Sequence, residues 1–327
     1  MKVCILGAGA WGTALAIALS THHELTLWTR DAGHCSEMDA ERVNRRHLDS
    51  VPFPSGLAVS ADFDAALSGA ELAIAAVPVS GLRETIRHIA RSGGRMPLVW
   101  VSKGFEAGTS KLPHQVAAEE YGDVAPIGVL SGPSFAWEVA KGLPVALTLA
   151  SKNGEFASRT ASLLSSTKMR IYSSEDIVGV EVGGAVKNVM AIAAGISDGL
   201  GLGNNARAAL ITRGLAEITR LGLKLGGRLE TFLGLSGVGD LTLTCTGNLS
   251  RNRTVGLLLA QGKPLDAILS DLGATAEGVY TASEVERLAS SLDVEMPITS
   301  AVCGILHHGI APRDAVEELM RRDPKPE

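Results

Sequence analysis

A glycine motif near the N-terminus constrains the fold of this chain more than any other feature. Gly7, Gly9 and Gly12 form the pattern G-x-G-x-x-G directly after an apolar stretch, residues 2–6, that predicts a strand. Helix-forming residues follow at 13–19, and alternating residues predict a second strand at 24–28. In that context the first glycine permits a tight turn, the second lets backbone approach a pyrophosphate, and the third lets helix meet sheet. The motif favours a dinucleotide-binding loop over a purely structural turn.

The rest of the first half predicts a mostly parallel sheet. Buried strands are expected at 71–77, 98–101, 127–130, 145–150 and 169–172, and helical segments lie between them. Ligands of such sheets bind outside the carboxyl ends of the strands. Lys103, Gly132 and Ser134 follow two of these ends, although a lysine in that position is often only a solvated loop residue. Residues 32–60 are polar and are expected to be loop-rich.

The second half predicts helices and no strands. Helical periodicity is expected at 180–194, 205–221, 228–233, 252–260, 264–270, 280–291, 298–307 and 312–321. A chain of 327 residues is long enough for two domains of ordinary size. The predicted fold class is therefore α/β: a Rossmann-like, mostly parallel sheet in a domain at 1–178, followed by an all-helical domain at 179–327.

One lysine stands in the most apolar helix of the chain. Residues 180–194 are apolar on nearly every side, which is typical of a buried helix, yet they include Lys187. A buried lysine must find partners or lower its pKa, and both outcomes recur at catalytic sites. The alternative is a lysine that snorkels to the surface between packed helices. Gly183 and Gly184 precede it, and paired glycines inside a helix indicate that another backbone approaches closely there.

The residues after the second strand bear on the choice of cofactor. NAD-specific sites usually place an acidic residue there to bind the ribose 2′-hydroxyl. Here Arg30 is suited to a 2′-phosphate, while Asp31 would accept a hydroxyl or cap the next helix. This pair favours NADP(H) over NAD(H), with NAD(H) kept as the alternative.

A second cluster of polar residues lies at 239–253, which we expect to be a loop. Ser250, Arg251 and Asn252 stand just before a predicted helix, where they would offer donors and a helix N-terminus to a phosphate. The simpler interpretation is a capped helix with surface arginines. Asp240 would likewise be a turn residue.

Composition excludes several classes of function. The net charge of −5, the pI near 5.9 and an aromatic content of 4% argue against nucleic-acid binding. The four cysteines are scattered without zinc-ligand spacing, which predicts reduced thiols in a cytoplasmic protein and no metal site. Glycines interrupt the apolar N-terminus, so it is read as structure and not as a signal peptide. No other stretch is long and apolar enough to span a membrane.

The motifs together resemble the bacterial NAD(P)-dependent glycerol-3-phosphate dehydrogenases. They occur in family order from residue 3 to about 300, and their joint occurrence is highly specific. The matching segments are 7–16, 102–104, 131–136, 183–188, 205–214, 237–241 and 249–253. The family pattern Tyr-Leu-Pro is altered here to His47-Leu-Asp-Ser-Val-Pro. That change bears on the adenosine side of the site.

The resemblance implies reversible reduction of dihydroxyacetone phosphate to sn-glycerol 3-phosphate, the backbone of phospholipids. It implies that Lys187 exchanges a proton with the substrate oxygen in a cleft between the domains. Substrate contacts are implied for Lys103, Gly132, Ser134, Asp240, Ser250, Arg251 and Asn252. Cofactor contacts are implied for Gly7, Gly9, Ala10, Trp11, Gly12, Arg30, Lys103, Ala136, Arg251, Thr275 and Glu277. A homodimer is a family expectation, and no nucleic-acid or membrane-embedded partner is implied.

Two other functions remain open at this point. A β-hydroxyacid dehydrogenase also joins a Rossmann domain to helices that carry a catalytic lysine, but it acts on a carboxylate. A non-catalytic NADP-sensing protein would bind the cofactor without turnover. Turnover of dihydroxyacetone phosphate with NADPH distinguishes all three hypotheses.

Overall fold

The computed structural model describes residues 1–93, 95–272 and 276–323. The chain forms two compact units. The first comprises Met1–Lys103 and Leu112–Ile177, and the second comprises Gly104–Lys111 and Val178–Glu327. The short segment Gly104–Lys111 therefore belongs with the helices of the second half, although it lies between two elements of the first unit.

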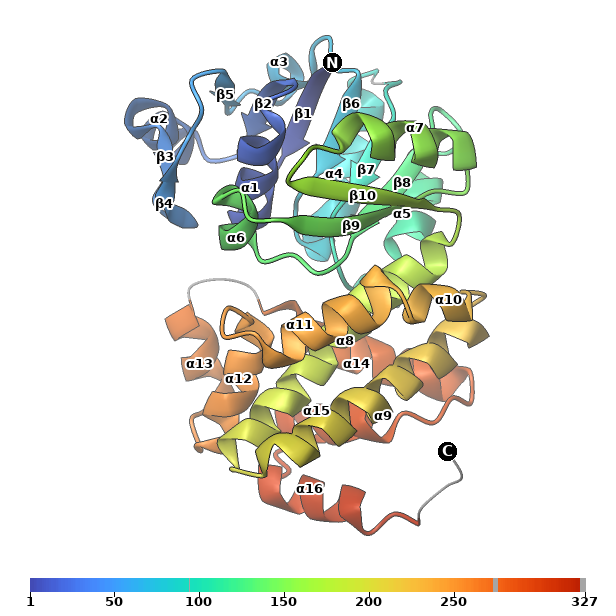
Figure 1. Ribbon diagram of the computed structural model, residues 1–327. Coiled ribbons are helices and arrows are strands. Elements are labelled where there is room, and N and C mark those ends of the chain that lie inside the picture. Colours follow the sequence, from blue (N-terminus) through green and yellow to red (C-terminus); the bar gives the residue numbers. More distant parts are fainter. Residues whose placement is uncertain (94, 273–275, 324–327) are drawn as a thin grey trace. The chain divides into compact units, whose positions relative to one another are not determined.

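An eight-stranded sheet forms the centre of the first unit (Figure 1). Its strand order is β10-β9-β8-β7-β6-β1-β2-β5. The strands are β1 (Lys2–Leu6), β2 (Glu24–Trp28), β5 (Leu57–Ser60), β6 (Leu72–Ala75), β7 (Leu98–Trp100), β8 (Ile127–Ser131), β9 (Val145–Ala150) and β10 (Met169–Ser174). Every neighbouring pair is parallel except β8 and β9, which are antiparallel. The predicted mostly parallel sheet is confirmed.

Burial explains why these segments are strands. The central strands β1, β6 and β7 are short apolar runs that are buried almost throughout, as expected where helices cover both faces of a parallel sheet. At the sheet edge, β10 alternates instead: Met169 and Ile171 are buried, whereas Arg170 and Tyr172 are exposed. Period-two burial of this kind is typical of a strand with one solvated face.

Seven helices and a two-stranded hairpin complete the described part of the first unit. The helices are α1 (Ala10–Leu19), α2 (Ala32–Glu41), α3 (Phe63–Leu67), α4 (Val79–Arg91), α5 (Pro113–Glu120), α6 (Ala136–Ala140) and α7 (Gly154–Leu164). The hairpin pairs β3 (Val43–Asn44) with β4 (Leu48–Pro52). The prediction that residues 32–60 are loop-rich is wrong: α2 forms behind an Asp31 cap, and β5 pairs with β2.

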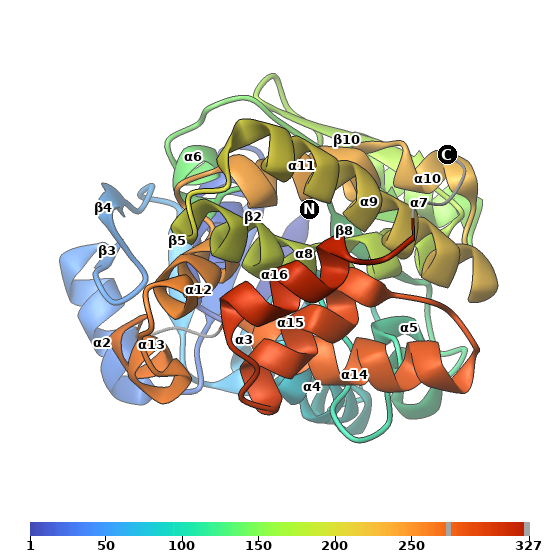
Figure 2. The same cartoon turned by 90° about the horizontal axis from the view of Figure 1, so that it is seen from below.

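The second unit is helical, as predicted, within the residues that the structure describes. Its helices are α8 (Ile177–Gly199), α9 (Gly203–Lys224), α10 (Leu229–Phe232), α11 (Asp240–Thr246), α12 (Arg251–Ala260), α13 (Leu265–Leu272), α14 (Glu277–Ser291), α15 (Pro297–His307) and α16 (Pro312–Met320). A kinked segment, η1 (Leu235–Gly239), leads into α11, and Gly237 within it has the non-helical angles φ −103° and ψ −105°. Figure 2 shows α15 lying between α14 and α16, and both pairs are in contact.

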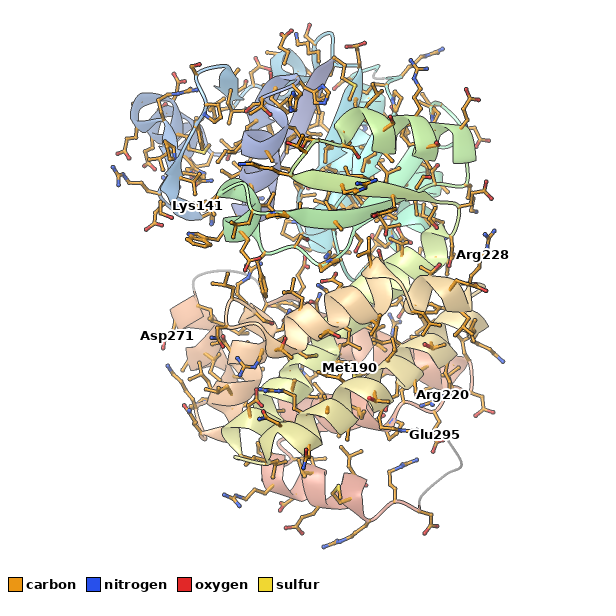
Figure 3. All side chains as sticks on the ribbon, in the orientation of Figure 1. Lys141, Met190, Arg220, Arg228, Asp271 and Glu295 are labelled. Carbon is orange, nitrogen blue, oxygen red and sulfur yellow. The ribbon has the colours of Figure 1, made fainter. Side chains whose placement is uncertain are left out.

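Helix α8 runs through the middle of this unit, where Met190 is labelled in Figure 3. It is the one described helix that is long and apolar enough to cross a membrane, but 94% of that window is buried inside the protein. It is therefore the core helix around which the others pack. At the margin of the unit, the guanidinium of Arg220 on α9 donates to the backbone carbonyl of Glu295, at 3.1 and 2.9 Å (Figure 3).

The segment Gly104–Lys111 is held by α14. The carboxylate of Glu284 accepts hydrogen bonds from the Gly108 backbone N–H at 3.0 Å and from the Ser110 hydroxyl at 2.8 Å. Arg287 donates to the Gly108 carbonyl at 3.0 Å and is ion-paired with Glu284. Three hydrogen bonds thus hold a segment that the sequence did not separate from the first domain.

Candidate active site

The glycine motif has the local geometry that its spacing predicts. Gly7 has φ +121°, and an added Cβ would lie 2.5 Å from the carbonyl oxygen of Ala76, so the turn requires glycine. A Cβ on Gly12 would lie 2.0 Å from the Gly7 oxygen, which is the close approach of helix to sheet. A Cβ on Gly9 would meet no atom within 4 Å. The protein's own packing thus explains Gly7 and Gly12, whereas glycine at Gly9 suits the approach of a ligand to the N-terminus of α1.

A buried asparagine that the sequence analysis passed over holds this loop. The side-chain amide of Asn44, in β3, donates to the Ala8 carbonyl at 2.9 Å and to the Thr13 hydroxyl at 2.8 Å. Its carbonyl oxygen lies 3.0 Å from His34 Nε2 on α2. Asn44 is fully buried, so its four polar contacts, including one from the His47 N–H at 3.2 Å, are made by protein. Asn44 belongs to no recognisable motif, and it lies in the stretch 32–60 whose composition predicts loops.

Arg30 and Asp31 have different surroundings. Asp31 caps α2: one carboxylate oxygen accepts from the His34 backbone N–H at 2.9 Å, and the other accepts from Arg46 at 2.8 Å. The His34 N–H and the Arg46 guanidinium both lower the pKa of Asp31. Arg30 is exposed and forms no ion pair within the described residues. Because Asp31 is engaged as a cap, Arg30 is the side chain at this strand end that is available to a ribose substituent.

Lys103, Gly132 and Ser134 come together beyond the carboxyl ends of β7 and β8. The carbonyl oxygen of Gly132 accepts from Lys103 Nζ at 3.2 Å and from the Ser134 hydroxyl at 3.0 Å. Both side chains are partly buried, so Lys103 is not the fully solvated loop lysine of the simpler interpretation. An ammonium and a hydroxyl therefore meet at one carbonyl oxygen beyond the carboxyl ends of these two strands.

Two helix N-termini supply the remaining predicted cofactor residues of the first unit. Ala10 and Trp11 form the first turn of α1, and Ala136 begins α6. Helices α1 and α6 pack against each other, and Trp11 and Ala136 both border the hydrophobic core. All three residues are partly exposed and follow the carboxyl ends of β1 and β8, where a bound dinucleotide is expected.

In the second unit Lys187 is a buried, paired lysine. It is 6% exposed, so the snorkelling alternative is wrong. Its ammonium is ion-paired with Asp240, which is 1% exposed, and donates to the Thr244 hydroxyl at 3.0 Å. Thr244 in turn donates to the Asp240 backbone carbonyl at 2.6 Å. Thr244 was missed, although its spacing of four residues from Asp240 would place both on one helix face.

A local irregularity brings Asp240 to the lysine. The prediction of a loop over 239–253 is wrong for 240–246, which form α11, so Asp240 is the first residue of a helix and not a turn residue. In η1, a Cβ on Gly237 would lie 2.0 Å from the Phe232 oxygen. A Cβ on Gly183 would lie 2.3 Å from the Ser236 oxygen, which confirms the predicted close backbone approach to α8.

The three residues at the start of α12 have separate tasks. Ser250 is buried and caps the helix by accepting from the Arg253 N–H at 3.3 Å. Asn252 is also buried: its amide donates to Asn188 Oδ1 at 3.0 Å, and its oxygen accepts from the Gly278 N–H at 3.1 Å. Arg251 is exposed and forms no ion pair within the described residues. Among these side chains, Arg251 is the one positioned to meet a solvent-borne anion.

Glu277 is the first residue of α14, immediately before Gly278, and is partly buried. Thr275, the other predicted cofactor residue of this region, lies outside the described residues. Glu277 therefore neighbours the Asn252–Asn188 contact through the backbone of Gly278.

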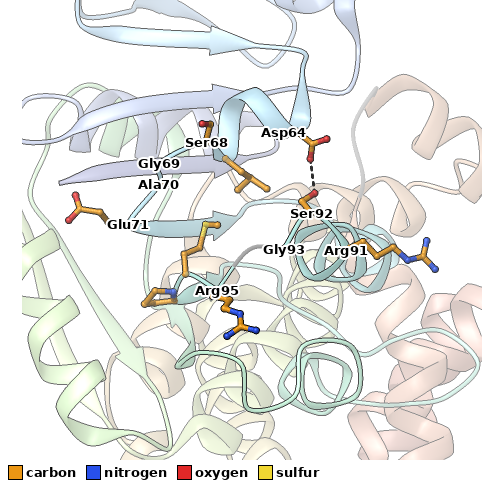
Figure 4. A pocket seen from close by; sticks show the side chains of 12 residues that line it. Asp64, Ser68, Gly69, Ala70, Glu71, Arg91, Ser92, Gly93 and Arg95 are labelled. Atoms are coloured by element: carbon orange, nitrogen blue, oxygen red, sulfur yellow. Dashed lines mark hydrogen bonds between the residues drawn. The ribbon is translucent and has the colours of Figure 1, made fainter.

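A cavity of about 700 Å³ lies at the other end of the strands, away from their carboxyl ends (Figure 4). Its lining includes residues just before β6 and β7, among them Glu71 and Pro97, so it lies at the amino ends of these strands. Figure 4 shows the Ser92 hydroxyl donating to Asp64 at 2.6 Å. The cavity is lined by none of the predicted site residues. Parallel sheets bind their ligands beyond the carboxyl ends of the strands, which is the other end of the sheet.

Two family models match consecutive parts of the chain. The model of the NAD-dependent glycerol-3-phosphate dehydrogenase N-terminus matches residues 2–157, and the model of the C-terminus matches residues 176–317. Together they span most of the sequence, in the same order as the two structural units.

Individual relatives agree with these models. The chain is 60% identical to a glycerol-3-phosphate dehydrogenase [NAD(P)+] of Nitrosospira multiformis, over 100% of this chain and 99% of the relative. It is 59% identical to one of Thiobacillus denitrificans, over 99% and 98%. A crystal structure of the glycerol-3-phosphate dehydrogenase of Coxiella burnetii is 44% identical, with a TM-score of 0.94 and coverage of 98% and 99%.

Proposed function

The chain belongs to the NAD-dependent glycerol-3-phosphate dehydrogenase family, and on that premise we propose how its residues serve the reaction. It is an oxidoreductase that reduces dihydroxyacetone phosphate to sn-glycerol 3-phosphate with NAD(P)H, in a reversible reaction. The relatives with more than half of their residues identical carry this activity in their names, which favours it over the β-hydroxyacid and NADP-sensing alternatives.

Lys187 is the proposed proton donor. Bound NAD(P)H supplies the hydride, and negative charge develops on the substrate oxygen as its carbonyl carbon is reduced. The Lys187 ammonium stabilises that charge and transfers one proton to the oxygen, which leaves a hydroxyl and a neutral amine. In the reverse direction the neutral amine accepts the proton. The support is the burial of Lys187 and its contacts with Asp240 and Thr244, which fix the direction of the Nζ atom.

Asp240 has a positioning role in this scheme. A buried carboxylate opposite the ammonium is its ion-pair partner and holds the Nζ atom in one direction. Removing one partner of a buried ion pair leaves an uncompensated charge and costs about 3–5 kcal/mol. The proposal therefore assigns Asp240 both to the stability of the second unit and to the orientation of the proton donor.

The proposed substrate and cofactor contacts follow the two units. Arg251 at the start of α12 binds the phosphate of dihydroxyacetone phosphate, with Lys103, Gly132 and Ser134 completing the substrate contacts. Gly7, Gly9 and Gly12 form the pyrophosphate loop, and Arg30 binds the 2′-phosphate of NADP(H). The support is the open geometry at Gly9 and the exposure of Arg30 and Arg251. The unit that contains the sheet would bind most of the cofactor and part of the substrate, and the helical unit would supply the catalytic lysine and the phosphate contact.

Location and assembly are part of the same proposal. We infer a cytoplasmic enzyme that supplies the glycerol backbone of phospholipids, because all four cysteines are unpaired thiols and three of them are buried. A homodimer is inferred from the family. Sedimentation equilibrium of the purified protein tests it: a mass near 34.0 kDa would contradict the dimer.

The decisive experiment is oxidation of NADPH in the presence of dihydroxyacetone phosphate. Turnover with dihydroxyacetone phosphate, and none with 2-oxo- or 3-oxo-carboxylates, is expected for the wild-type chain. Lys187→Ala should retain NADPH binding and lose turnover. A wild-type chain that binds NADPH without turning over would support the NADP-sensing alternative and overturn the proposal.

A further inference from the structure

A cluster of three potential metal ligands lies in the second unit. Glu286 is on α14, Cys303 is on α15, and His308 is the residue that ends α15. One carboxylate oxygen, the thiol sulfur and one imidazole nitrogen all lie within 4.8 Å of one another. None of these residues belongs to the family motifs or to the proposed reaction. The cluster needs its own explanation.

The two helices form an antiparallel hairpin, which is why the residues meet. A short connection separates the end of α14 at Ser291 from the start of α15 at Pro297. In such a hairpin, positions at similar distances from the connection face each other, and Glu286 and Cys303 lie five and six residues from the helix ends that it joins. The thiol of Cys303 lies beside the Glu286 carboxylate and the Ser283 hydroxyl. A thiol–carboxylate contact alone accounts for this pair but gives no reason for a histidine beside it.

Backbone contacts fix the turn that carries the histidine. The N–H groups of His308 and Ile310 both donate to the Gly304 carbonyl, each at 3.1 Å. The preceding His307 is used elsewhere, since its Nε2 lies 3.1 Å from the Val279 carbonyl. His308 is therefore held next to Cys303 at the C-terminus of α15, where the helix dipole favours a cation.

The chemistry of the three groups selects the metal. We propose that Glu286, Cys303 and His308 form a binding site for Zn²⁺ that ties α14 to α15. Thiolate and imidazole ligands suit Zn²⁺ and exclude the oxygen-preferring ions Mg²⁺ and Ca²⁺. One thiolate, one carboxylate and one neutral imidazole balance the two positive charges of the ion. Coordination breaks the S–H bond of Cys303, and the proton passes to solvent.

The geometry requires only a small adjustment. Metal–ligand bonds of about 2.1–2.3 Å in a tetrahedron place ligand atoms roughly 3.5–3.8 Å apart. Cys303 is only 2% exposed, so its sulfur has little room to move. Glu286 is partly exposed and His308 is exposed, so both have room to close on the ion, and water completes the fourth position. Sequence reasoning missed the site because its ligands come from two helices without a recognised spacing.

Cobalt provides a spectroscopic test in the intact protein. Protein stripped with a chelator and titrated with Co²⁺ should bind one equivalent and develop a thiolate-to-cobalt charge-transfer band, which Zn²⁺ then abolishes by displacement. Cys303→Ser should remove the band. The matched control is Cys35→Ser, at a half-exposed cysteine outside the cluster, and it should retain the band in full.

His308 is the exposed ligand, so its substitution tests metal binding without disturbing the fold. His308→Ala changes a surface side chain, so the variant should fold and turn over normally, yet bind Co²⁺ and Zn²⁺ at least tenfold more weakly. Zn²⁺ should raise the melting temperature of the wild type and not that of His308→Ala. The proposal is overturned if no thiolate band forms at micromolar Co²⁺, if Cys303→Ser retains it, or if His308→Ala binds as tightly as the wild type.

Discussion

The side-chain amide of Asn252, at the start of α12, donates to the side-chain carbonyl of Asn188 on α8, at 3.0 Å. Asn188 is the residue after Lys187, and the oxygen of Asn252 also accepts from Gly278 at the start of α14. A single buried amide thus ties together the helix that carries the lysine, the helix that begins with Arg251 and the helix that begins with Glu277. The packing of these three helices against one another therefore depends on a contact between two uncharged side chains.

Asn252→Ala should therefore act through stability and geometry. It leaves the Gly278 N–H and the Asn188 oxygen buried without their partner, which costs about 1–3 kcal/mol of unfolding free energy. Chemical denaturation measures that loss, and kcat should fall together with it. If Asn252 served only to bind phosphate through its side chain, KM would rise and the denaturation midpoint would not change.

Arg251→Ala should show the opposite pattern. Because Arg251 is exposed, its removal should leave the denaturation midpoint almost unchanged. Loss of a charge-assisted contact worth about 1.5–3 kcal/mol should raise KM for dihydroxyacetone phosphate by roughly 10- to 100-fold. Dihydroxyacetone without phosphate should be turned over equally by both proteins. NADPH affinity is measured in parallel, since the same arginine is a proposed cofactor contact.

Arg30→Ala should change cofactor preference. The 2′-phosphate of NADPH loses its partner, so the Kd for NADPH should rise by roughly 10- to 100-fold. NADH has no 2′-phosphate and should bind as before. Fluorescence titration of both cofactors gives the ratio, and equal losses would assign Arg30 a structural role.

Asn44→Ala should weaken both cofactors alike and is the natural comparison for Arg30→Ala. Asn44 holds the Ala8 carbonyl and the Thr13 hydroxyl on either side of the pyrophosphate loop. Loosening that loop should raise the Kd of NADPH and of NADH by the same factor, about tenfold for each 1.4 kcal/mol lost. A change confined to one cofactor would contradict this role.

Lys187→Ala should separate binding from chemistry. NADPH should bind normally, while kcat with saturating substrate should fall by about 10²–10⁴. Because the ammonium donates in one direction and the amine accepts in the other, reduction and oxidation should depend on pH in opposite senses in the wild type. A fall of less than tenfold would remove Lys187 as the donor, and Lys103→Ala would be the next variant to measure.

The sequence predicted those parts of the site that depend on local chain geometry. G-x-G-x-x-G and the strand before it are sufficient to place Gly7, Gly9 and Gly12, because the turn, the helix start and the strand end are neighbours in the chain. Lys187 became a candidate because a charge in an apolar helix is conspicuous, and the same pattern predicts its burial, which the structure shows with 6% of the residue exposed.

Contacts between distant segments were not predictable in the same way. Asn44 looked like one of many polar residues in a stretch rich in loop-forming types, and its burial depends on α2 and the glycine loop folding over it. Helix α11 was hidden because threonine and cysteine are weak helix formers, and its start at Asp240 is set by the close packing of Gly237 against Phe232. In both cases tertiary packing overrode local preference.

The contact between Gly108 and Glu284 also limits the order in which segments of this protein can fold during synthesis. The two residues are 176 positions apart, so Gly108 leaves the ribosome long before the carboxylate that holds it. The sheet ends at β10, but Glu284 and Arg287, which hold Gly108 and Ser110, are made only with α14. A nascent or truncated chain that stops at Ile177 would therefore present 104–111 as an undocked, protease-accessible loop.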